Sequence, residues 1–82
     1  MDQKIMELTL LLMYLTGWEE DSRKNPGEKI FCSWKGHSFM ALNKLADDNL
    51  IIQFKDKKLT ILTEAGRNAA ENLKAKYFGN KA

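Results

Sequence analysis

The segment Gln3–Thr16 constrains the fold most strongly, because it predicts a helix that is apolar on nearly every side. Asp2 is a suitable N-cap for this helix and Gly17 suits its end. Three apolar stripes follow helical spacing: Ile5, Leu8, Leu12 and Leu15; Met6, Leu10 and Met13; and Leu11, Tyr14 and Trp18. The domain's own core covers one side of such a helix. The other side therefore requires the last helix or a second copy of the chain.

A second copy is our interpretation of the surplus apolar side. The last helix is rich in alanine, and small side chains permit close approach of a neighbouring helix. We therefore expect a homodimer, with the interface formed by Met6, Leu10, Met13 and Tyr77.

Size and composition predict one domain spanning residues 1–82. The chain has 82 residues, of which 44% are hydrophobic and 29% charged, as is usual for a globular fold. The longest apolar-rich run, residues 8–15, is too short to span a bilayer, and no basic leader precedes it. Cys32 is the only cysteine, so an intrachain disulfide is excluded. We expect a reduced, cytoplasmic protein that does not interact with membranes.

Motifs of enzyme and metal sites are absent from the sequence. It has no glycine-rich phosphate loop, no HExxH and no GxSxG motif. His37 is the only histidine, and Cys32 does not lie at a ligand spacing from it. We expect neither a catalytic activity, nor a metal, nor a cofactor.

The middle of the chain predicts a long connection. Asn25, Pro26 and Gly27 form a strong turn signal, because proline fixes φ and glycine accepts positive φ. Residues 30–34 are ambiguous between a short strand and an irregular turn. We interpret residues 18–35 as a long loop or a shortened supporting helix.

The second half of the chain predicts a helix, a hairpin and a last helix. A helix over about residues 36–49 precedes two strands, at 50–54 and 59–62, which the polar turn 55–58 connects. Thr63 is a suitable N-cap for the last helix, which Gly79 and Asn80 end. Helices segregated from a small hairpin define an α+β domain.

Two sets of strings carry resemblances. KLADDNLI at residues 44–51 and LTEAGR at 62–67, with a hairpin between them, resemble winged helix-turn-helix bacterial regulators. LLLMYLTGWEE at 10–20 and SWKGHSF at 33–39 resemble, more closely, a family of short bacterial proteins of unknown function. The first resemblance implies a small winged-helix domain with the order helix, long loop, helix, hairpin wing and last helix.

The winged-helix resemblance implies binding to double-stranded DNA, as in a homodimeric transcription regulator. The second helix would then present its outward residues to the major groove, and the hairpin tip would hold phosphates. On this sequence the positions are Lys35, His37, Ser38, Ala41 and Lys44 on the helix, and Lys55, Lys57 and Lys58 at the tip. The charge distribution agrees, since residues 1–22 hold five acids and one base, whereas residues 23–60 hold eight bases and four acids.

A different interpretation stays open for the same residues. A helix face that is exposed to solvent is polar whether or not it binds DNA. Lysines at a hairpin tip also protect a sheet edge from aggregation. The place of the helix that normally supports a recognition helix is taken by residues 18–34, which have little apolar periodicity. The alternative is a non-enzymatic winged-helix module that binds proteins and not DNA.

Overall fold

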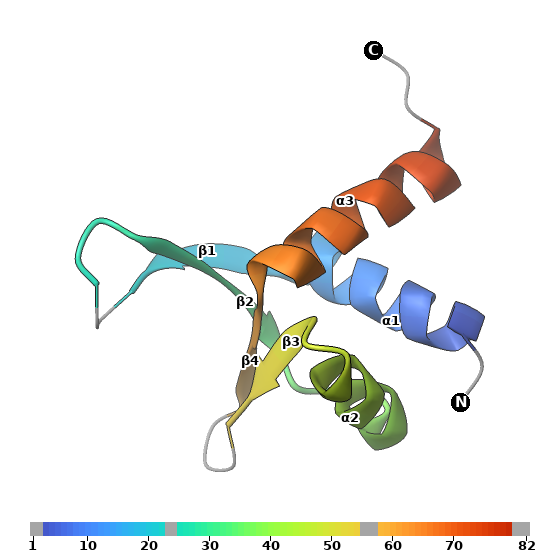
Figure 1. The fold of residues 1–82 in the computed structure, drawn as a ribbon, viewed down its shortest axis with the longest axis horizontal. Helices are drawn as coiled ribbons and strands as arrows, with labels where there is room; N and C mark the ends of the chain where they lie inside the picture. Colours follow the sequence, from blue (N-terminus) through green and yellow to red (C-terminus); the bar gives the residue numbers. More distant parts are fainter. Residues whose placement is uncertain (1–2, 23–24, 55–57, 80–82) are drawn as a thin grey trace.

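The computed structural model describes residues 3–22, 25–54 and 58–79, and three helices and four strands lie within them (Figure 1). In chain order these are α1 (Gln3–Thr16), β1 (Trp18–Asp21), β2 (Lys29–Trp34), α2 (Phe39–Asp47), β3 (Ile51–Gln53), β4 (Leu59–Leu62) and α3 (Glu64–Phe78). The bounds of α1 agree with the sequence prediction. Its predicted N-cap, Asp2, lies outside the described residues.

The strands form one antiparallel sheet in the order β1-β2-β4-β3. The three helices gather on one side of it, and the β1–β2 hairpin projects away from them (Figure 1). The register aligns Phe31 with Leu62 and Leu62 with Ile51, and all three belong to the buried core. The α+β class is therefore confirmed, with the core between the helices and this face of the sheet.

The prediction of a long loop or a shortened supporting helix at residues 18–35 is wrong, because this stretch contains the hairpin of β1 and β2. The Asn-Pro-Gly turn is confirmed and lies in the connection between these strands. The carbonyl of Asn25 accepts from the N–H of Glu28 at 3.0 Å, and Gly27 has a φ of 93°. The β-prone residues of β2 then pair with β4 on the other side, so the hairpin is fixed to the rest of the sheet.

The second helix is shorter than predicted. Ser38 is its N-cap, and its side chain accepts from the N–H of Ala41. Beyond α2, Asn49 adopts a φ of 62° and leads the chain into β3. No helix precedes α2 within residues 18–22 and 25–38, so the described structure does not contain the helix pair in which a recognition helix is normally supported.

Candidate interaction surfaces

One face of α1 lies in the core of the domain. Met6, Leu10 and Met13 are buried against α2, α3 and the sheet, and the exposure of Met13 is 0%. The prediction that these three residues form a dimer interface is therefore wrong, because their own chain already covers them. Tyr77, the fourth predicted residue, lies at the surface near the end of α3 with 37% of its area exposed.

The opposite face of α1 is also apolar, and it is uncovered. We call it the outer stripe of α1, and it comprises Ile5, Leu8, Leu12 and Leu15, whose exposures are 48%, 45%, 49% and 45%. Their spacing of three, four and three residues is that of the a and d positions of a heptad. Beside the stripe, the hydroxyls of Thr9 and Thr16 donate to carbonyls of the same helix at 2.7 Å. The stripe therefore has the pattern of a helix-pairing surface.

The exposed side of α1 is the outer stripe and not the side of Met6, Leu10 and Met13 that the sequence predicts. Ile5 and Met6 both begin apolar stripes of helical spacing, and hydrophobicity alone does not say which stripe faces inward. Met6, Leu10 and Met13 also follow heptad spacing, so only the packing of the other helices and the sheet against α1 distinguishes the two stripes.

A second apolar surface lies on the face of the sheet that points away from the core. Trp18, Cys32, Ile61 and Ile52 are successive partners across the four strands, and they alternate with the core residues. The rings of Trp18 and Trp34 contact each other with centroids 5.2 Å apart. Trp34 is 58% exposed, so the ring contact between β1 and β2 lies at the surface of the sheet.

The residues predicted to contact DNA from the second helix have roles within the chain. The Nζ of Lys35 donates to the carbonyl of Phe54 at 2.7 Å, Ser38 caps α2, and Lys44 pairs with Asp48 at 3.6 Å. Ala41 is buried at 0% exposure, which corrects its placement on the outward face. His37 is half-buried and precedes the cap of α2.

The hairpin tip is described only in part. Lys55 and Lys57 lie outside the described residues. Lys58 is exposed, and its carbonyl accepts from the N–H of Lys35 at 2.8 Å. The chain thus brings Lys58 and Lys35 together at the end of β2, where the side chain of Lys35 also reaches the end of β3.

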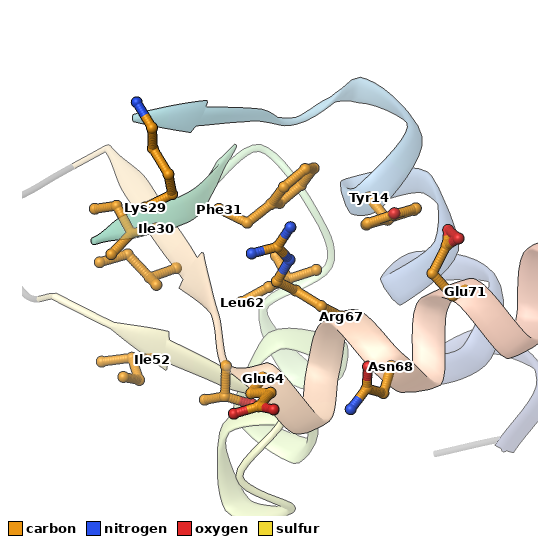
Figure 2. A pocket seen from close by; sticks show the side chains of 12 residues that line it. Tyr14, Lys29, Ile30, Phe31, Ile52, Leu62, Glu64, Arg67, Asn68 and Glu71 are labelled. Atoms are coloured by element: carbon orange, nitrogen blue, oxygen red, sulfur yellow. The ribbon is translucent and has the colours of Figure 1, made fainter. Parts of the chain in front are cut away.

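A groove of about 600 Å³ lies beside the first turns of α3 (Figure 2). In this view Arg67 stands between the residues of β2 and the pair formed by Tyr14 and Glu71. The Arg67 guanidinium lies 5.5 Å from the centroid of the Phe31 ring and 3.7 Å from the carboxylate of Glu19. A hydrogen bond to Glu71, with burial and the charge of that carboxylate, raises the pKa of Tyr14. Tyr14 and Glu71 thus bind each other within the groove, whereas Arg67 pairs with Glu19, which does not line it.

Cys32 is a buried thiol in β2. Burial and a hydrogen bond from its Sγ to the Glu20 carboxylate, 3.2 Å long, raise its pKa to about 11. A thiol of this kind holds its proton at neutral pH and reacts slowly.

The described residues offer neither a metal-binding cluster nor a membrane-spanning helix. Residues 3–22, 25–54 and 58–79 contain no group of three or more His, Cys, Asp or Glu side chains that could hold a metal ion. Over the same ranges, none of the helices has the length and apolar character that a membrane crossing demands.

The fold and its surfaces define a small α+β domain in which three helices lie on one side of a four-stranded antiparallel sheet. A family model described as a domain of unknown function, DUF6429, matches residues 1–80, and the chain belongs to this family. Neither the curated proteins nor the solved structures contain a match to the chain. The expected membership of a family of short, uncharacterised proteins is therefore confirmed, and that family carries no assigned activity.

Proposed function

We propose that the protein is a non-enzymatic interaction module that pairs with a second copy through the outer stripe of α1. The observation that carries the proposal is the simultaneous half-exposure of all four residues of the stripe. Contiguous exposed apolar surface is costly in water and marks binding sites on soluble proteins. The free thiol of Cys32 suits the reducing cytoplasm for such a module.

The size of the outer stripe sets the expected strength of the pairing. A standard interface buries about 800 Å² on each partner, and four half-exposed side chains provide less than this. We therefore expect a dimer that forms and dissociates with protein concentration. Completing the burial of one half-exposed leucine contributes about 1 kcal/mol, and each leucine occurs twice in a two-fold dimer.

Analytical ultracentrifugation of matched variants tests the proposal. Leu12→Glu places a charge in the stripe and should weaken dimerisation by roughly thirtyfold or more, as a loss of about 2 kcal/mol implies. Ile52→Glu is the control, because Ile52 is similarly exposed at 47% but lies on the outer face of the sheet. Circular dichroism checks that both variants fold. Dimerisation that survives Leu12→Glu, or a wild-type chain that stays monomeric at millimolar concentration, would refute the proposal.

DNA binding is a second candidate function, supported by the β3–β4 hairpin that follows α2 and by the exposed side chains of Lys44 and Lys58. Its test is fluorescence anisotropy with random duplex DNA at increasing salt. Phosphate contacts predict binding that falls steeply with salt and weakens when Lys55, Lys57 and Lys58 are replaced by alanine. Absence of binding at low salt would refute DNA binding and leave the interaction module as the only proposed function.

A further inference from the structure

The outer stripe of α1 has the same spacing in both directions along the helix. Leu8 is three positions after Ile5, Leu12 is four positions after Leu8, and Leu15 is three positions after Leu12. We infer that two copies pack with their α1 helices antiparallel, so that Ile5 lies opposite the partner's Leu15 and Leu8 lies opposite the partner's Leu12. This inference rests on the pairing proposed above and specifies its geometry.

The symmetry of the stripe favours a second copy as the occupant. The two copies are related by a two-fold axis that is perpendicular to α1 and lies level with the midpoint between Leu8 and Leu12. This axis places each residue of the stripe opposite a stripe residue of the partner. Both copies then use the same patch, and the assembly closes at two chains. The stripe lies opposite the buried face of α1, which places it on the outside of the domain.

The residues that flank the stripe also favour a second copy. Helix pairs select a different partner mainly through charges beside the apolar contact. Positions 4, 9 and 16 flank the stripe at the surface, whereas Leu11 is buried in its own domain, and of the three only Lys4 is charged. The flanking residues therefore have too little charge to select a helix of another sequence or to oppose pairing with an identical helix.

Electrostatics distinguishes the two orientations. A parallel pair would bring together two Lys4 side chains and the positive N-terminal ends of two α1 helices. In the antiparallel pair Lys4 lies at the same level along the axis as the partner's Thr16, near the negative C-terminal end of the partner helix. The two Lys4 residues are then about 18 Å apart along the helix axis, since position 16 is twelve positions after position 4.

Cysteine crosslinking tests the orientation in solution. In a Cys32→Ser background, Leu8→Cys and Leu12→Cys are prepared separately, one of them with an affinity tag, and oxidised alone and mixed. A disulfide needs Cα atoms within about 7 Å, which an antiparallel pair provides only between position 8 and position 12 of the partner. We expect the mixture to form a disulfide dimer of one tagged and one untagged chain roughly tenfold faster than either variant alone. Ile52→Cys, which lies outside the outer stripe, gives the rate at which a disulfide forms when two chains meet only by random collision.

The possible outcomes separate this inference from the proposed function. Faster crosslinking of Leu8→Cys alone than of the mixture would establish a parallel pair, which overturns the inference and leaves the proposed pairing intact. Crosslinking at no more than the Ile52→Cys rate, in samples that ultracentrifugation shows to be dimeric, would place the interface elsewhere and overturn both. If ultracentrifugation shows that the wild-type chain and the cysteine variants are all monomeric, both the inference and the proposed function are overturned.

Discussion

Gly66, in the first turn of α3, lies directly against the backbone of Leu50, which joins α2 to β3. The carbonyl of Leu50 also accepts from the N–H of Thr63 at 3.0 Å and from its hydroxyl at 3.1 Å. The carbonyl of Leu50 therefore fixes the start of α3 on the connection between α2 and β3.

A methyl group at Gly66 should destabilise the domain. A Cβ atom there would collide with the carbonyl of Leu50, which is backbone and does not yield like a side chain. We expect Gly66→Ala to lower the free energy of unfolding by about 1–3 kcal/mol in urea denaturation. Gly36→Ala is the control, since a Cβ at Gly36 has no atom within 4 Å, and it should change stability by less than about 0.5 kcal/mol. Equal effects of the two changes would contradict this packing.

The N-cap of α3 should contribute more than that of α2. The Thr63 hydroxyl accepts from the N–H of Gly66 at 3.0 Å and donates to the carbonyl of Asn49 at 2.7 Å. Ser38 accepts from the N–H of Ala41 at 3.5 Å. We expect Thr63→Ala to cost about 1–2 kcal/mol and Ser38→Ala about 0.5 kcal/mol. Thermal unfolding of both variants compares the stability that the two caps contribute. A larger loss of stability for Ser38→Ala than for Thr63→Ala would contradict the expected order.

The Tyr14 hydroxyl should stabilise the contact between α1 and α3. Its hydrogen bond to Glu71 is lost in Tyr14→Phe, whereas the stacking on Phe31, with centroids 5.0 Å apart, is retained. We expect a loss of about 0.5–1.5 kcal/mol at neutral pH. Glu71→Gln keeps a hydrogen-bond acceptor and should cost less. A neutral effect of Tyr14→Phe would mean that water replaces the bond without loss.

The thiol of Cys32 should make stability depend on pH in the alkaline range. Its pKa is about 11 in the folded chain and 9.0 without the fold, so the folded state holds the proton more tightly between these values. Stability should therefore fall as pH rises from 9 to 11, by less than about 1.4 kcal/mol per pH unit. Subtracting the profile of Cys32→Ser isolates this contribution. Alkylation of the native thiol at pH 8 should also be slow, and fast alkylation would contradict its burial.

Local signals predicted much of the fold. The apolar periodicity of α1, the Asn-Pro-Gly turn and the cap at Thr63 each depend on residues close in the sequence, and all three are confirmed. Strand β1 was missed because its three acids, Glu19, Glu20 and Asp21, are poor strand formers. In the fold each has a partner: Arg67, the Cys32 thiol and Lys29, respectively. Those partners come from β2 and α3 and cannot be read from the local sequence.

The candidate surfaces were harder to predict than the elements. Both sides of α1 are apolar, and Leu42, Leu45 and Ala70 from the other helices decide which side is buried. The outward role expected for Lys35 depended on the helix extending to residue 36, whereas α2 begins at Phe39. Its side chain instead binds the carbonyl of Phe54, a contact across nineteen residues of sequence.

The most direct measurement of pairing through the outer stripe is isotope-filtered NMR on an equal mixture of ¹³C-labelled and unlabelled protein. It detects only contacts between different chains. Intermolecular methyl contacts should appear at Ile5, Leu8, Leu12 and Leu15, and should disappear on dilution. Intermolecular contacts at Trp34 and Ile52 with none at the outer stripe, or no intermolecular contacts at millimolar concentration, would contradict the proposed pairing.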